Sequence, residues 1–164
     1  MVADGHGGTS DARIVKFSAD GRYLRSWGRK GSAAGEFDIP HGIAIDSKGR
    51  LFVADLNNFR VQAFDQEGTF LFQWTQFGMP GGVFVDAKDI LYVADSLSGT
   101  DRHPGWVRGI RLGSVVDGKV VAFIRDRTPN AEPITAAEGV AVDRQGTVCG
   151  AVVPSQRLQK HVRR

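Results

Sequence analysis

The chain has 164 residues, with 21 Lys and Arg against 18 Asp and Glu, so its formal net charge is +3. This length allows one domain with a sizeable core, and a hydrophobic share of 41% is too high for a disordered chain. One cysteine excludes an internal disulfide framework, and no apolar run is long enough to span a membrane. The mild positive charge is poor evidence for nucleic-acid binding.

Internal repeats indicate the architecture from the first residues onward. The chain opens on the triplet Val-Ala-Asp, without the charged start and apolar stretch of a secretory signal. That triplet occurs at residues 2–4, 53–55 and 93–95. A second apolar motif that ends in Asp occurs at residues 40–46, 80–86 and 137–143. The distance from Asp46 to Asp86 is 40 residues and from Asp86 to Asp143 it is 57, which indicates insertions in the later unit.

The second repeat shows what one unit contains. Enrichment in Val, Ile and Phe between turn signals predicts strands at 42–46, 51–55, 60–64 and 69–74. The first is apolar on both faces, so we expect it to be buried on both sides, and the last is the most mixed, so we expect it outermost. No segment predicts a convincing helix. Units of four strands and about 40–45 residues are typical of β-propeller blades.

The strands of the whole chain are predicted to group as three, four, four and three. We therefore expect one all-β domain over residues 1–164, an incomplete propeller ring. Because propellers have about four to eight blades, the rest of the ring is expected outside this chain, with two copies closing one ring as the competing arrangement. The predicted blade segments are residues 1–27, 42–74, 82–124 and 139–162.

Because successive strands of a blade run in opposite directions, the connections alternate between two faces of the propeller; this is the strand parity of the blade. Tight turns share one face, at residues 20–21, 48–49, 67–68, 117–118 and 145–146. Long loops share the other, at residues 5–12, 28–40, 96–107 and 125–137. Binding and catalysis concentrate on long loops held by a rigid frame, so the long-loop face is predicted to be functional. It carries His6, His41, Arg102, His103, Trp106 and Glu138.

The first residue of each innermost strand is expected at the mouth of the central channel. These residues are His41, Gly81 and Glu138. His41 and Glu138 belong to alternate blades, so in a six-bladed ring they would converge on the axis. Imidazole and carboxylate are ordinary zinc ligands, and catalytic zinc usually has three protein ligands. The pattern predicts a metal site, for zinc or alternatively calcium, with His41 and Glu138 as ligands and a third ligand before residue 1.

Each of these residues also has a structural interpretation. His41 is then a hydrogen-bonded residue at a blade entrance, Glu138 an ordinary loop carboxylate, and His6 a solvent-facing loop residue. The recurring Asp4, Asp55 and Asp95 are expected to be structural, satisfying turn amides or pairing with cations in the next strand. Those cations are Arg13, Arg60 and Arg108.

Residues 35–46, 51–55 and 58–64 resemble NHL repeats. Their order, with Asp4-Gly5-His6 and residues 13–17 before them, is similar to the peptidyl-α-hydroxyglycine α-amidating lyases and their bacterial relatives. This resemblance implies a six-bladed propeller, of which the chain holds about three to four blades. It also implies a zinc ion in the channel held by three His from alternate blades, and a secreted or periplasmic protein.

The resemblance carries over to single positions. His41 matches one zinc ligand in its Pro-His context, and Glu138 stands where a second ligand would be. The catalytic Tyr of the lyases follows an Asp-Gly pair, and here His6 follows it as the candidate proton-transfer residue. Leu56 stands in place of a substrate-contacting Arg, and Gly139 in place of an Asp.

These observations favour a propeller that binds a small peptide, a small molecule or another protein on its long-loop face. The alternative is a zinc-dependent lyase that breaks the C–N bond of a peptidyl-α-hydroxyglycine and releases glyoxylate. A calcium-dependent lactone hydrolase is a third hypothesis, for which the sequence offers no clear set of acidic ligands.

Overall fold

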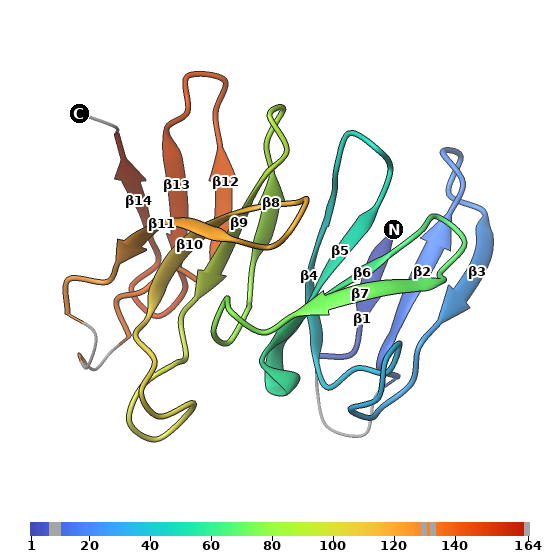
Figure 1. Cartoon of the computed structure of the whole chain (residues 1–164), viewed down its shortest axis with the longest axis horizontal. Helices are drawn as coiled ribbons and strands as arrows, with labels where there is room; N and C mark the ends of the chain where they lie inside the picture. The colour runs from blue at the N-terminus through green and yellow to red at the C-terminus, as the bar shows by residue number, and fades with distance from the viewer. Residues whose placement is uncertain (7–10, 129–130, 132–133, 163–164) are drawn as a thin grey trace.

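The computed structural model describes residues 1–6, 11–128, 131 and 134–162. These residues form four antiparallel sheets that follow one another side by side (Figure 1). The described part contains one short 3-10 helix, η1 (Leu56–Asn58), and no helix long and apolar enough to cross a bilayer.

Each sheet is built from strands in chain order. The first contains β1 (Val2–Asp4), β2 (Arg13–Phe17) and β3 (Tyr23–Trp27). The second contains β4 (Pro40–Ile45), β5 (Leu51–Asp55), β6 (Arg60–Phe64) and β7 (Phe70–Trp74). The third contains β8 (Val83–Val85), β9 (Ile90–Asp95), β10 (Gly109–Ser114) and β11 (Val120–Arg125). The fourth contains β12 (Gly139–Val142), β13 (Val148–Val152) and β14 (Arg157–His161).

This arrangement confirms the predicted all-β propeller segment. The described strands group as three, four, four and three, and they form no closed ring. The strands of the second repeat begin within two residues of their predicted positions, and β7 lies at the outer edge of its sheet as expected. Along the inner side, β4 packs between β1 and β8, and β12 packs against β8.

The core lies between the sheets rather than inside any one of them. Ile14, Phe37 and Phe64 fill the space between the first two sheets. Phe52 and Phe77 do the same between the second and third. A third cluster, which includes Ile110, joins the third sheet to the fourth. Every residue of β5 and β6 is buried, because neighbouring sheets cover both faces of these two strands.

The prediction that β4 is buried on both sides was wrong. Its residues from His41 to Ala44 are half-buried, and Ile45 is 48% exposed. The innermost strand borders the ring axis, where the described residues place no further sheet, so its apolar side chains are covered only by neighbouring blades. Its hydrophobicity reflects these contacts with β1 and β8 rather than full enclosure.

Four of the tight turns are closed by their own aspartate, whereas Ser18 Oγ accepts the N–H of Arg22 in the β2–β3 turn. The Asp46 carboxylate accepts the N–H groups of Lys48 at 3.0 Å and Arg50 at 2.8 Å, two and four residues further on. The same two contacts recur at Asp65, Asp86 and Asp143. Backbone N–H donation lowers the pKa of Asp65 and Asp143, since these hydrogen bonds favour the charged form.

Figure 1 shows the turns β4–β5, β8–β9 and β12–β13 at one end of the sheets and the long connections at the other. The predicted turn glycines adopt left-handed backbone angles, with φ between 69° and 87°. Residues 7–10, 129–130 and 132–133, which belong to two of the predicted long loops, lie outside the described residues.

The Val-Ala-Asp aspartates pair with arginines, with one correction. Arg13 donates to Asp4 at 3.0 Å and Arg60 donates to Asp55 at 2.7 Å, as predicted. Asp95 pairs instead with Arg111 at 3.1 Å, so the prediction of Arg108 was wrong. Gly109 is the residue opposite Asp95 in the strand register, where Arg60 stands opposite Asp55. The cation is therefore supplied from two residues further along β10.

Candidate functional site

His41 and Glu138 meet on the long-loop face. His41 is the second residue of β4, and Glu138 directly precedes β12, two sheets away. Their side chains contact each other, with 3.0 Å between His41 Nε2 and Glu138 Oε1. The intervening sheet contributes Gly81, where an added Cβ would lie 3.4 Å from Glu138 Cγ. Because Gly81 has no side chain, two residues from alternate blades can form a direct hydrogen bond.

Glycines also let the innermost strands approach closely at this mouth. A Cβ added to Gly42 would lie 2.6 Å from the carbonyl oxygen of Gly81. One added to Gly82 would lie 2.6 Å from the carbonyl oxygen of Glu138. Neither position can carry a larger residue without moving the neighbouring blade, so the close packing that brings His41 to Glu138 depends on the sequence of all three inner strands.

The entry to β4 is held by the buried Asp55. Its carboxylate accepts the backbone N–H of Asp38 at 2.7 Å, and the N–H of Leu56 donates to the carbonyl of Ile39 at 3.1 Å. Ile39 has a φ of 61°, a left-handed conformation that a β-branched residue rarely adopts. Strain of this kind persists only where the surroundings impose it, and here it fixes the direction in which His41 leaves the loop.

Asp55 itself is fully buried among donors. Arg60, Asn58 and Gln62 donate to its Oδ2 at 2.7, 2.9 and 3.1 Å. Burial raises the pKa of Asp55, and the hydrogen bonds with the Arg60 charge oppose that rise. This residue is therefore part of the frame behind the site rather than a group that could contact a ligand.

His6 lies beside His41. The two imidazole rings are 5.2 Å apart between centroids, at an interplanar angle of 63°. His6 follows β1 in the connection that leads to β2, so three different sheets bring His6, His41 and Glu138 together. An imidazole, a second imidazole and a carboxylate in one cluster can accept and donate protons.

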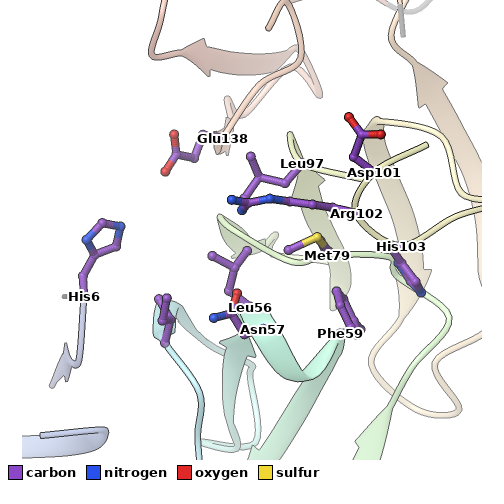
Figure 2. A pocket seen from close by; sticks show the side chains of 11 residues that line it. His6, Leu56, Asn57, Phe59, Met79, Leu97, Asp101, Arg102, His103 and Glu138 are labelled. Atoms are coloured by element: carbon purple, nitrogen blue, oxygen red, sulfur yellow. The ribbon is translucent and has the colours of Figure 1, made fainter. Parts of the chain in front are cut away.

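A cavity of about 580 Å³ opens beside this cluster. Figure 2 shows the side chains around it, with His6 and Glu138 on one side and Phe59 and His103 on the other. Its apolar lining consists of Ile39, Leu56, Phe59, Met79 and Leu97, and its polar lining of His6, Asn57, Asp101, Arg102, His103 and Glu138. His41 contacts Glu138 but does not itself line the cavity.

His103 is stacked between two aromatic rings. Its centroid lies 4.5 Å from that of Phe59 and 4.7 Å from that of Trp106, with interplanar angles of 17° and 12°. Its Nδ1 is 3.3 Å from the hydroxyl oxygen of Ser98. Burial lowers the pKa of His103, and the charge of Arg111 lowers it further against the opposing effect of Asp95.

The stack continues away from the cavity. The guanidinium of Arg111 lies 4.9 Å from the ring centre of Trp106 and 4.4 Å from that of Phe123. Trp106 thus contacts His103 from behind and is a support rather than a lining residue. The loop from Ser96 to Arg108 is tied by these contacts to β10 and β11.

Sequence reasoning missed the contribution of the β5–β6 connection. Leu56, Asn57 and Phe59 line the cavity, although their connection is only four residues long. Candidate binding loops were chosen by their length in the sequence, and the short β5–β6 connection was therefore not among them. Strand parity already placed it on the same face, which is the signal that could have found it.

The predicted metal site needs a third ligand before residue 1, so the described residues contain two of its three predicted ligands, His41 and Glu138. His41 and Glu138 are ligand-type side chains, but they are bonded to each other, and no group of three or more His, Cys, Asp or Glu within the described ranges is arranged to hold a metal ion. A catalytic zinc usually takes three protein ligands.

Comparison with known proteins identifies the repeats. The family model for the NHL repeat matches residues 37–64. NHL repeat-containing protein 3 of Homo sapiens is 40% identical over 74 residues, which are 44% of this chain and 21% of that protein. Peptidyl-glycine alpha-amidating monooxygenase A of Xenopus laevis is 38% identical over 79 residues, 44% of this chain and 8% of that protein. The chain thus spans about a fifth of the length of the first relative and less than a tenth of the second.

Solved structures agree on the fold. A streptogramin B lyase superposes with a TM-score of 0.63 at 14% identity, over 93% of this chain and 48% of that one. Virginiamycin B lyase from Staphylococcus aureus gives 0.61 at 14% identity, over 97% and 54%. At such identities the likeness shows the fold alone, and that fold is a β-propeller. With the repeat match at residues 37–64, the chain is a β-propeller segment of the NHL type.

Proposed function

We propose that this chain is a binding scaffold whose long-loop face holds a small ligand, or a short segment of another protein, in the cavity. The observation that carries the proposal is the origin of the cavity walls. Residues from six separate connections, distributed over all four sheets, line it. A rigid frame that directs so many connections to one hollow is typical of ligand-binding faces.

The chemistry of the lining supports the same proposal. Small-molecule sites are usually apolar hollows of about 300–1,000 Å³ with a few polar groups that fix orientation. Here Leu56 and Met79 are buried apolar residues, while Asn57 and Arg102 are exposed polar residues. A ligand could place an apolar part against the former and satisfy its polar groups with the latter.

Filling the cavity tests this proposal. Asn57 is exposed and lines the cavity, so Asn57→Trp should occupy the space without disturbing the core. The matched control is Gln145→Trp, at an exposed residue in a tight turn at the opposite end of the sheets. A fragment library screened by ligand-observed NMR should give hits with the unmodified protein and the control that Asn57→Trp abolishes. Equal binding by all three proteins would contradict the proposal.

We propose an amidating-lyase-like activity as the second candidate. Two observations favour it: the relationship to the Xenopus laevis enzyme, and the contact between His41 and Glu138 at the predicted channel mouth. In such a reaction the hydroxyl proton of a peptidyl-α-hydroxyglycine leaves, the C–N bond breaks, and the amide nitrogen gains a proton. His6 and Glu138 are the residues of this chain that could transfer these protons.

Glyoxylate release tests the second candidate. A peptide that ends in α-hydroxyglycine is incubated with the protein, and glyoxylate is measured against Glu138→Gln, which keeps the shape of the side chain and loses its charge. The proposal expects release that Glu138→Gln lowers about a hundredfold or more, the lower end of an acid–base contribution. Equal glyoxylate from both proteins and from buffer alone would overturn it. Zinc and calcium content of the same two samples tests whether His41 and Glu138 belong to a larger metal site.

A further inference from the structure

Arg102 is an unpaired cation at the cavity. Its guanidinium has no hydrogen bond or ion pair within the described part of the chain, although Asp101 and Glu138 line the same cavity. Figure 2 shows Arg102 extending across the cavity towards Glu138 and His6, and the Asp101 carboxylate turned away from it. Glu138 is engaged with His41 at 3.0 Å.

Arg102 lies next to apolar surface. Met79 is 2% exposed and Leu56 is 6% exposed, and both line the cavity that Arg102 crosses. The Arg102 side chain is itself exposed, so an incoming carboxylate or other oxyanion can reach its guanidinium and form two parallel hydrogen bonds with it. An apolar group attached to that anion would meet Leu56 and Met79.

The backbone presents Arg102 in a fixed position. The carbonyl of Arg102 accepts the N–H of Gly99 at 2.7 Å, and the next residue is His103, held between Phe59 and Trp106. His103 and Phe59 both have left-handed φ angles, 54° and 53°, so the contact joins two strained residues from neighbouring blades. Non-glycine residues keep such angles where the surroundings over-determine them, which is common at binding sites.

We propose that Arg102 is the anion-recognition group of this face and that the cavity takes a small acid with an apolar body. His103 is the positioning residue, which clamps the loop so that the guanidinium enters the cavity. This inference rests on the proposed binding function and adds to it the charge class of the ligand and the residue that selects it.

A charge series tests the ligand class. The probes are 4-phenylbutyrate, its neutral amide 4-phenylbutanamide, and the cationic 4-phenylbutylamine, which share one apolar body. Isothermal titration calorimetry should rank the anion first, the amide second and the amine last. Arg102→Gln should weaken the anion about tenfold, as expected for one charge-assisted pair, and leave the amide unchanged. The matched control Arg144→Gln, at an exposed arginine in a tight turn, should change neither.

The clamp has its own readout. His103→Ala removes the stacked ring and should lower the anion-to-amide preference about as much as Arg102→Gln does, because the guanidinium is no longer held in place. His103→Phe keeps a ring between Phe59 and Trp106 and should restore the preference. A merely structural role would change the affinity for both probes equally.

The outcomes separate the two proposals. Tighter binding of the amine would show that Asp101 and Glu138 decide the charge preference, which overturns the role of Arg102 while binding at this face stands. Equal affinity for all three probes would also overturn it and leave the binding function intact. No binding of any probe, with no fragment hit at the cavity, would overturn both.

Discussion

The aspartates of two Val-Ala-Asp triplets each pair with an arginine, and these two pairs provide a direct test of how burial sets the strength of an ion pair. Both pairs occupy the same register, Asp4 opposite Arg13 and Asp55 opposite Arg60. The side chains of Asp55 and Arg60 are 0% and 6% exposed, whereas those of Asp4 and Arg13 are 42% and 40% exposed. Replacing each arginine by Met removes the charge at nearly constant length.

The expected costs differ severalfold. Arg60→Met leaves the Asp55 charge without its counter-ion and removes the donors to the carbonyls of Ser32, Ala33 and Glu36. Breaking a buried pair in this way costs about 3–5 kcal/mol. Arg13→Met breaks a pair that water already screens, so it should cost at most about 1 kcal/mol.

Urea unfolding of both variants, followed by tryptophan fluorescence at neutral pH, measures the difference. The midpoint should fall much further for Arg60→Met than for Arg13→Met, with similar slopes of free energy against urea. Equal shifts, or a cost below about 1 kcal/mol for Arg60→Met, would refute the reasoning, because the buried network would then contribute no more than an exposed pair.

Two further predictions concern the site and the frame. Burial lowers the pKa of His103 below its ordinary 6.5, so the unfolded chain takes up the proton first as the pH falls. The contribution of His103 to stability should be fully present above pH 6.5 and be lost as the pH falls through the folded-state pKa. In His103→Phe the melting temperature should therefore change less with pH between about pH 7.5 and about pH 5. In the turns, Gly68→Ala places a Cβ 2.7 Å from the Trp27 ring, whereas at Gly49 the nearest atom is 3.9 Å away. Because both glycines have positive φ, Gly49→Ala should lower the free energy of unfolding by about 1–2 kcal/mol, and Gly68→Ala should lower it clearly more. Urea unfolding measures both costs, and equal costs would show that Trp27 moves aside freely.

The fold was predictable because its signals are local. The short motifs that end in Asp46 and Asp86, the alternation in β7 and the turn glycines are each recognised from a few neighbouring residues. Burial of β4 was not predictable in the same way. An apolar strand that is only partly covered by two neighbouring blades has the same sequence pattern as an apolar strand that is fully enclosed. Only the position of the strand in the ring distinguishes the two.

The site was predictable in location and less so in its contacts. Strand parity placed His6, His41 and Glu138 on one face, and the structure places them in contact. The sandwich around His103 depends on Phe59 of another blade, and the pairing of Asp95 depends on Gly109 leaving its register position without a side chain. Contacts between side chains distant in sequence follow from blade packing, which no repeat motif encodes.

The aspartates that close four of the tight turns give the chain a modular folding unit. The Asp46 carboxylate accepts the N–H groups two and four residues away and the guanidinium of Arg50, all within its own hairpin, so this hairpin can form before any other blade is present. Hairpins closed in this way have low contact order and can nucleate independently along the chain. Duplication of such a unit in the gene adds a blade whose hairpins can fold on their own, so the number of blades can change in evolution while the tight turns stay the same.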